Sequence, residues 1–77
     1  MKKVQILGTG CPKCKKLAEL AAKAVAESGV EAEVVKVDDM NEILAFGVMM
    51  TPALAVDGTV KVVGKVPGVD EIKKLIA

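Results

Sequence analysis

The chain has 77 residues, and its 11 basic and 10 acidic residues leave a formal net charge of +1. This length is close to the lower limit for one hydrophobic core, so we expect a single domain over residues 1–77. The near-neutral charge and the lack of Trp and Tyr argue against nucleic-acid binding, because the chain has no basic field and neither of these residues for bases to stack on. A 52% hydrophobic content with one aromatic residue, Phe46, predicts an aliphatic core and excludes disorder.

The first predicted element is a strand from Lys3 to Leu7, which is rich in branched residues and ends before Gly8. The apolar part of this segment is too short for a signal peptide, and no run approaches the ~20 apolar residues of a membrane span. We therefore expect a cytoplasmic protein without membrane attachment. In a reducing compartment, two neighbouring cysteines are more often catalytic or metal-binding than structural.

The next segment, Pro12 to Ser28, has helical periodicity, with lysines and glutamates on one stripe and apolar residues opposite. Pro12 suits the first turn, where its missing N–H is not needed, and Gly29 suits the position just past the end. Cys11 then lies close to the N-cap, while Cys14 lies one turn deeper on the apolar stripe. The cysteine pair therefore lies between the first strand and this helix, at the start of the helix.

A second strand and a short helix follow. Residues 30–37 alternate apolar with acidic before becoming mostly apolar, which predicts a strand that pairs in parallel with the first through the intervening helix. Asp39 is a candidate N-cap with Glu42 three residues later, and Gly47 is placed to end the brief helix. The chain is then interrupted at Thr51-Pro52.

The last three elements are a β-hairpin and a closing helix. Residues 53–56 and 60–63 flank Asp57-Gly58, a strong signal for a tight hairpin turn. Residues 69–76 have apolar residues three to four apart, with acids in the first turn and lysines near the end, as the helix dipole favours. The order β-α-β-α-β-β-α predicts an α/β fold with a four-stranded mixed sheet and helices on both faces.

Cys11 and Cys14 are the candidate catalytic residues. A thiol attacks a disulfide only as thiolate, and a second thiol must then resolve the mixed disulfide. Cys11 sits at the positive end of a helix with lysines at positions 13, 15 and 16 nearby, so its thiolate is favoured and it is the expected nucleophile. Cys14 is the expected resolving thiol. Pro12 stiffens the turn, and Lys13 can point outward beside the active sulfur.

Other interpretations of this pair remain open. A bridge across so short a loop removes little unfolded-state entropy, so a structural staple is disfavoured. Two reduced cysteines near a helix start can also be ordinary small residues. A zinc site needs four N or S donors, and the chain has no His, but two thiolates could hold Cu(I) or half of a shared site. The nearby lysines can be a solvated face or can steer an acidic partner.

A β-α-β unit with Cys-Pro-x-Cys at the start of its helix, then Thr51-Pro52 before a hairpin and a closing helix, resembles thioredoxin and glutaredoxin. It is most similar to the compact archaeal and bacterial small redox-active disulfide proteins. The resemblance covers Val4 to Ile76 and implies a thioredoxin-like fold in which the bond before Pro52 is cis. It also implies that Thr51 and Pro52 contact substrate. Because Pro12 and Lys13 lie beside the sulfurs, we expect them to contact substrate as well. The first strand, unlike that of thioredoxin, carries no buried acid to accept a proton.

The main functional hypothesis is therefore a thiol–disulfide oxidoreductase that exchanges disulfides with partner proteins, draws electrons from a reductant not encoded here, and needs no cofactor or metal. We expect it to be a monomer. Met49 and Met50, beside Thr51, can contact partners or be soft metal ligands, and we expect at least one of them to pack in the core.

Three alternatives remain open. A soft-metal carrier for copper or zinc would use the same two thiolates, as in copper chaperones, whose chains end in a strand. A glutaredoxin-like reductase would bind glutathione, and Gly68 and Asp70 are an imperfect match to its carboxylate-binding residues. A non-catalytic interaction module would keep the fold with vestigial cysteines.

Overall fold

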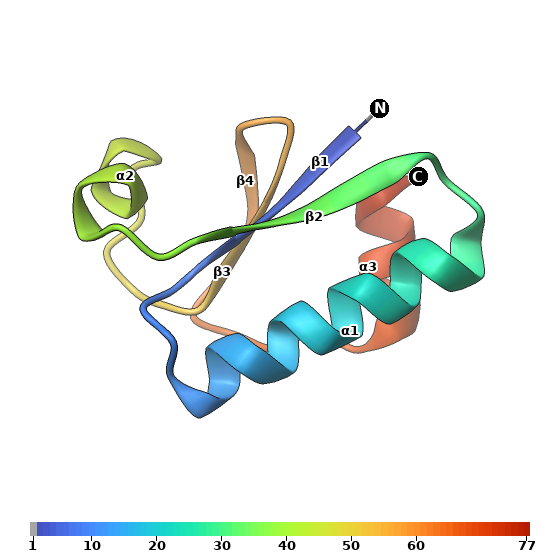
Figure 1. Cartoon of the computed structure of the whole chain (residues 1–77), viewed down its shortest axis with the longest axis horizontal. Helices are drawn as coiled ribbons and strands as arrows, with labels where there is room; N and C mark the ends of the chain where they lie inside the picture. The colour runs from blue at the N-terminus through green and yellow to red at the C-terminus, as the bar shows by residue number, and fades with distance from the viewer. Residues whose placement is uncertain (1) are drawn as a thin grey trace.

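The computed structural model describes residues 2–77, and its elements follow the order predicted from the sequence (Figure 1). The elements are β1 (Lys2–Leu7), α1 (Pro12–Ser28), β2 (Ala32–Val37), α2 (Met40–Ala45), β3 (Ala53–Val56), β4 (Thr59–Val63) and α3 (Val69–Ile76). Within the described residues, none of the three helices has the length and apolar character needed to cross a membrane.

The four strands form one mixed sheet in the order β2-β1-β3-β4, which confirms the predicted α/β class. β1 and β2 are parallel, with Leu7 opposite Val37, whereas β1 and β3 are antiparallel, with Leu7 opposite Ala53. The end of β1, the end of β2 and the start of β3 consequently lie side by side. The loops that leave β1 and β2 and the loop that enters β3 all meet at this end of the sheet.

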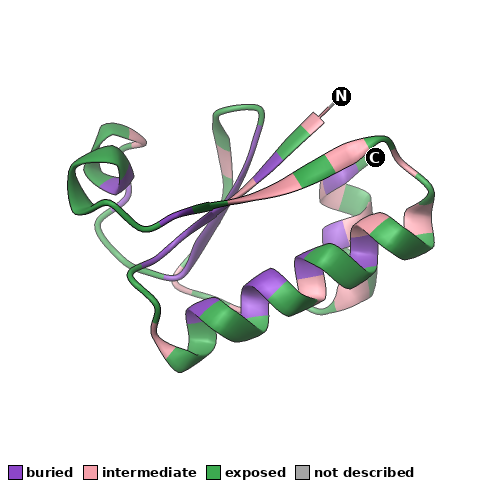
Figure 2. Ribbon diagram, in the orientation of Figure 1, coloured by how far each residue is buried: buried purple, intermediate pink, exposed green. Residues whose placement is uncertain are grey.

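Helices cover both faces of the sheet, as predicted. Strand side chains alternate between faces, so Val4 and Ile6 of β1 point to one side and Leu7 to the other. The larger core lies under α1 and α3, and the buried side of α1 faces the sheet in Figure 2. Its buried members are Val4, Ile6, Leu17, Ala18, Ala21, Ala24, Leu54, Val56, Val62, Ile72 and Ile76. The smaller core lies under α2 and comprises Leu7, Val37, Ile43, Val48 and Ala53.

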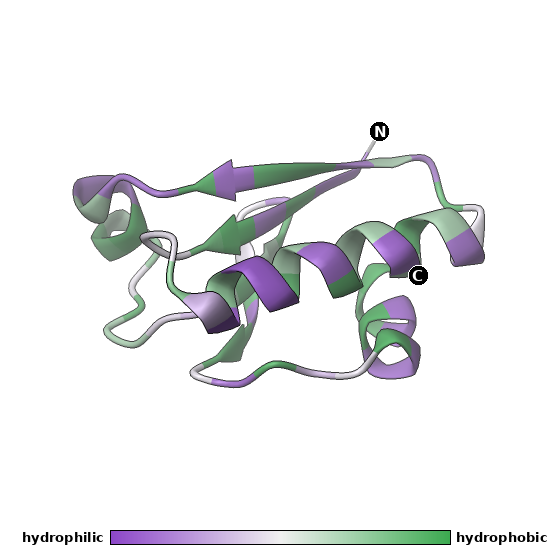
Figure 3. Ribbon diagram, turned by 60° about the horizontal axis from the view of Figure 1, so that its bottom comes forward, coloured by the Kyte–Doolittle hydropathy of each residue, from purple (hydrophilic) through white to green (hydrophobic). Residues whose placement is uncertain are grey.

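The long helix α1 is amphipathic, and Figure 3 shows hydrophilic bands along its outer side. It ends at Gly29, whose φ of 72° is a left-handed conformation that glycine adopts without a Cβ clash. The Val30 N–H donates to Ser28 Oγ at 3.3 Å. Val30 therefore belongs to the helix exit, and β2 begins at Ala32, two residues later than the alternation predicts.

The turn between β3 and β4 is the predicted Asp57-Gly58 hairpin. Both residues have positive φ, 52° and 85°, as a tight turn between twisted strands requires. Asp57 Oδ1 accepts the Lys3 N–H at 2.8 Å, and the Gly58 N–H donates to Gln5 Oε1 at 2.8 Å. The tip of the hairpin is thereby fixed to β1.

Candidate active site

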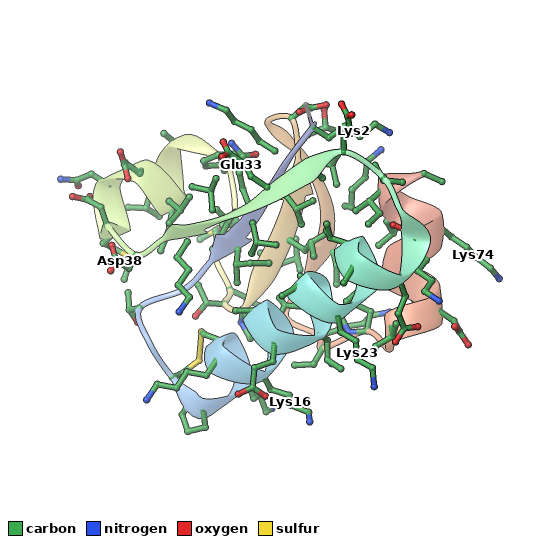
Figure 4. The ribbon with its side chains drawn as sticks, turned by 45° about the vertical axis from the view of Figure 1, so that its right-hand side comes forward. Lys2, Lys16, Lys23, Glu33, Asp38 and Lys74 are labelled. Carbon is green, nitrogen blue, oxygen red and sulfur yellow. A yellow bond between two sulfur atoms is a disulfide. The ribbon has the colours of Figure 1, made fainter. Side chains whose placement is uncertain are left out.

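Cys11 and Cys14 form a disulfide at the start of α1, drawn as the yellow bond in Figure 4. Cys11 is the N-cap, in an extended conformation, and Pro12 occupies the first helical turn, as the sequence predicts. One turn of helix brings the two Cα atoms to 5.1 Å. Cys11 Sγ also accepts the Cys14 N–H at 3.2 Å, so the outer sulfur caps an N–H group that the helix leaves free.

The two sulfur residues differ in exposure. Cys14 is buried, with 5% of its surface exposed, because it shares the inner stripe of α1 with Leu17 and Ala18. Cys11 is half-buried at the edge of the helix end, and Pro12 and Lys13 beside it are exposed. The structure therefore brings a reachable sulfur and a shielded sulfur together, with two of the predicted substrate-contacting residues next to the reachable one.

Gly8 is a site residue that the sequence analysis did not single out. A Cβ at this position would collide with Cys14 Sγ and would lie 3.0 Å from Cys14 Cβ. The backbone at the end of β1 is held there by the Gly8 N–H, which donates to the Val37 carbonyl at 3.0 Å. Only a residue without a side chain lets the strand end pass this close to the inner sulfur. A glycine just after a strand and just before a cysteine motif was the available signal.

The Thr51–Pro52 peptide bond is cis, which confirms the expectation drawn from the resemblance. Pro52 is buried and Thr51 is exposed. Thr51 Cβ lies 4.0 Å from the point where a Gly8 Cβ would stand, a point that also abuts Cys14 Sγ. The loop before β3 therefore adjoins the disulfide across Gly8.

A second glycine that the sequence analysis overlooked supports this loop. The Gly64 N–H donates to the Pro52 carbonyl at 2.8 Å, and the φ of Gly64 is 71°. A Cβ on Gly64 would lie 3.3 Å from the terminal methyl of Met50. The chain leaving β4 thus holds the loop that contains Thr51 and Pro52.

Met49 and Met50 are both exposed, by 93% and 62%, so the expectation that one of them packs in the core is wrong. Val48 is buried under α2 and Pro52 is buried at the start of β3, so the core positions on either side of the loop are already filled. The residues between them project outward. Among residues 2–77, three other large apolar side chains are exposed, namely Met40, Leu44 and Val63.

The lysines near the disulfide are exposed and make no ion pair within residues 2–77. Lys16 and Lys23 extend from α1 away from the sheet in Figure 4. The ion pairs of α1 lie at its other end, where Glu27 contacts Lys73 at 2.8 Å and Lys23 at 4.0 Å. The hydrogen bond from Lys73 lowers the pKa of Glu27, and the same bond raises the pKa of Lys73.

A pocket of about 210 Å³ adjoins the inner sulfur. Its lining residues are Ile6, Gly8, Gly10, Cys14, Lys15, Ala18, Lys36 and Asp38. It includes Cys14 and does not include Cys11. β1 contributes an apolar side chain, Ile6, and the charged groups come from α1 and from the end of β2.

The other predicted alternatives find less support in the geometry. In the described part of the chain, no group of three or more His, Cys, Asp or Glu side chains could hold a metal ion. The chain closes in the helix α3, whereas copper chaperones end in a strand. Gly68 is the N-cap of α3 and Asp70 lies in its first turn, where a carboxylate suits the helix dipole, so a helix start accounts for both residues.

The sequence is similar to proteins of known family over its whole length. The family model described as "Thioredoxin domain" matches residues 2–77. A protein named thioredoxin from Methanothermobacter thermautotrophicus is 46% identical over 77 residues, covering 100% of both chains. A second, from Methanocaldococcus jannaschii, is 49% identical over 71 residues, covering 92% of this chain and 81% of its own. A probable thioredoxin from Methanothermobacter marburgensis is 34% identical over 70 residues, covering 87% and 81%.

Proposed function

The chain belongs to the thioredoxin family and is a protein disulfide oxidoreductase, and from this premise we propose that it reduces disulfides of partner proteins with Cys11 as nucleophile and Cys14 as resolving thiol. The observation that carries the assignment of roles is the difference in exposure of the two sulfur residues. A partner disulfide can approach the half-buried Cys11 but not the buried Cys14. The first attack therefore falls to Cys11.

The proposed reaction has two exchange steps. The Cys11 thiolate attacks one partner sulfur, forms a mixed disulfide and releases the other partner sulfur as thiolate. Cys14 then attacks Cys11 Sγ, which forms the Cys11–Cys14 bond and expels the second partner thiolate. The partner gains two electrons and the enzyme pair loses them, and a reductant must return them. The free N–H groups of the first turn of α1, one of which reaches Cys11 Sγ at 3.2 Å, stabilise negative charge on this sulfur.

Thr51 and Pro52 are proposed to align the backbone of the substrate. Within residues 2–77 the N–H and carbonyl groups of Thr51 make no hydrogen bond, and the residue is exposed beside the disulfide. Pro52 has no N–H and its carbonyl is occupied by Gly64. An extended partner segment would therefore find free backbone groups at Thr51 and not at Pro52, and it would also meet Pro12 and Lys13 beside the outer sulfur.

The exposed apolar side chains favour a protein as the partner. Met40 and Leu44 belong to α2, while Met49 and Met50 belong to the loop that leads to Thr51. Unbranched Met side chains adapt to differently shaped surfaces, which suits a protein that binds several partners. A small disulfide would not need this apolar surface.

Trapping of the mixed disulfide tests the proposal. Cys14→Ser should retain the first attack and accumulate a covalent complex with a protein disulfide such as insulin, because nothing expels the partner. Cys11→Ser should form no complex and show no turnover, and it is the matched control because it also removes one sulfur. Complex formation by Cys11→Ser, or unchanged turnover in either variant, would contradict the assigned roles.

A further inference from the structure

The pocket beside the disulfide is lined by Cys14, which carries the resolving sulfur, and not by Cys11, which carries the attacking one. Its lining includes Cys14, Gly8 and Gly10, whereas Cys11 is absent from it. A disulfide substrate in this pocket would be out of place for attack by Cys11. With a volume of about 210 Å³, the pocket can instead hold several water molecules, each of which occupies ~30 Å³ in the liquid. Water in the pocket would therefore lie beside the buried residue Cys14.

The chemistry of the second step requires a proton acceptor. Cys14 must lose its proton before it can attack the mixed disulfide, because only a thiolate is nucleophilic. It is 5% exposed, and burial disfavours the charged form of a thiol. The buried side chains of the described residues include no polar or charged group, and β1 presents the apolar Ile6 to the pocket. A side chain that accepts this proton would therefore come from the rim of the pocket.

The rim carries three ionisable groups besides the thiol. Lys15 comes from α1, Lys36 from β2, and Asp38 from the residue that follows β2. β1 contributes Ile6 and Gly8, and the loop before β3 approaches through Thr51, none of which ionises in this range. In Figure 4 Asp38 lies where β2 runs into α2, at the end of the molecule that holds the disulfide. Asp38 is the carboxylate of the set, and the other two groups are cations.

We propose that Asp38 accepts the proton of Cys14 through water in this pocket, and that Lys15 and Lys36 stabilise the thiolate that results. The inference rests on the proposed function and concerns its second step. The Cys14 proton passes to the Asp38 carboxylate, and the thiolate then attacks Cys11 Sγ. The bond between Cys11 and the partner breaks, and the partner sulfur leaves with the electron pair. Asp38 returns the proton to solvent or to the departing thiolate. Asp38 is a positioning residue, since it acts on the sulfur through water.

The test separates the two steps by reacting the reduced protein with one equivalent of the chromogenic disulfide DTNB in a stopped-flow instrument. Attack by Cys11 releases a first coloured thiolate, and resolution by Cys14 releases a second. Asp38→Asn should leave the first phase unchanged and slow the second about 10²-fold near neutral pH, a contribution typical of a positioned proton acceptor. The second phase should recover as the pH rises well above the ordinary thiol pKa of about 8.5, because the buried Cys14 thiolate then forms without help.

Two further variants complete the design. Glu19→Gln is the matched control, because Glu19 is an exposed carboxylate next to the neighbouring groove and does not line the Cys14 pocket, so both phases should match the native protein. Lys36→Gln should slow the second phase near neutral pH and move its pH profile upward, because the thiolate loses a nearby cation. A fully retained profile in Lys36→Gln would remove the stabilising role given to that lysine.

The outcomes that would overturn the inference are distinct from those that would overturn the proposed function. An unchanged second phase in Asp38→Asn, or one slowed equally at every pH, would show that Asp38 takes no proton. If Glu19→Gln slowed the second phase as much as Asp38→Asn does, the slowing would be due to the loss of one negative charge and not to the position of Asp38. If the native protein released no second thiolate at all, the dithiol mechanism itself would fail, and this inference with it.

Discussion

The two ends of the molecule are built in different ways. The end that carries the disulfide holds a cis peptide bond, two glycines in close contacts, and exposed methionines. At the opposite end, α3 and the C-terminus lie near the last turns of α1 (Figure 1). There α3 packs against α1, Lys73 pairs with Glu27 at 2.8 Å, and Lys2 Nζ donates to the carbonyl oxygens of Ile76 and Ala77 at 2.9 Å.

The difference suggests a division of labour along α1. Its first turn has free N–H groups, exposed lysines and the Cys11–Cys14 disulfide, which is reduced and re-formed in the proposed reaction. Its last turns have buried apolar contacts to α3 and ion pairs. Stability should therefore depend mainly on the α3 end, and reactivity on the disulfide end. Variants at each end can show whether the two properties separate in this way.

The largest expected effect on stability is that of Ile72→Ala at the α3 end. Ile72 is fully buried in the larger core, and removing most of its side chain should cost about 2–5 kcal/mol of unfolding free energy. Small domains have a total of about 5–15 kcal/mol, so the loss is severe. Urea denaturation measures it. At low temperature and without urea, the rate of the first DTNB phase should stay native; a reduced rate in the folded variant would show that the two ends are coupled.

The next largest effect is expected for Gly8→Ala at the disulfide end. The added methyl group would collide with Cys14 Sγ, and forced packing of this kind costs about 1–3 kcal/mol. Unlike Ile72→Ala, this variant should also change thiol reactivity, seen as a slower second DTNB phase. Gly68→Ala is the matched control, because a Cβ there meets nothing within 4 Å. Native kinetics in Gly8→Ala would mean that the strand end shifts freely away from the sulfur.

A smaller effect is expected for Met49→Lys. Met49 is 93% exposed, so its replacement should leave the unfolding midpoint unchanged. If the exposed methionines bind partner proteins, the KM for insulin should rise about fivefold, which corresponds to about 1 kcal/mol. The rate with DTNB, a small disulfide, should stay the same and serves as the control. An equal loss with both substrates would show that Met49 acts on the sulfurs and not on partner binding.

The fold was largely predictable because its elements have strong local signals. Pro12 and Gly29 delimit α1, Asp39 caps α2 with bonds to the N–H groups of Asn41 and Glu42, and Asp57-Gly58 forms the hairpin turn. The start of β2 was less predictable. Alternation continues through Val30, but the hydrogen bond of its N–H to Ser28 Oγ keeps it in the helix exit.

The site was predictable only where its residues are close together in the sequence. The proximity of the two cysteines follows from one turn of helix, and their difference in burial follows from the amphipathic pattern. The contact of Gly8 with Cys14 Sγ and the bond from Gly64 to Pro52 depend on strand register. Neither could be derived from one chain's pattern of residues. The exposure of Met49 likewise depends on Val48 and Pro52 filling the core first.

The smallest effect is expected for Glu27→Gln at the α3 end. Glu27 gains the bond to Lys73, but a negative charge near the C-terminal end of α1 opposes the helix dipole, so the net contribution is small. Both side chains are exposed enough for solvent to screen the pair. The variant should lower the thermal midpoint near neutral pH by less than either buried substitution, and added salt should shrink the difference.

The pH dependence identifies the cause of this small effect. Because Lys73 lowers the pKa of Glu27 below its ordinary 4.5, the contribution is present above that value and is lost as pH falls through the lowered pKa. Because Glu27 raises the pKa of Lys73 above 10.5, the same contribution is lost again as pH rises through the raised pKa. The difference in midpoint between native protein and Glu27→Gln should therefore be greatest between these limits and vanish in acid. Glu19→Gln, which removes a carboxylate without an ion pair among residues 2–77, should show no such profile. A difference that persists in acid would mean that Glu27 acts through packing on α3. The ion pair with Lys73 would then contribute nothing to the stability of that end.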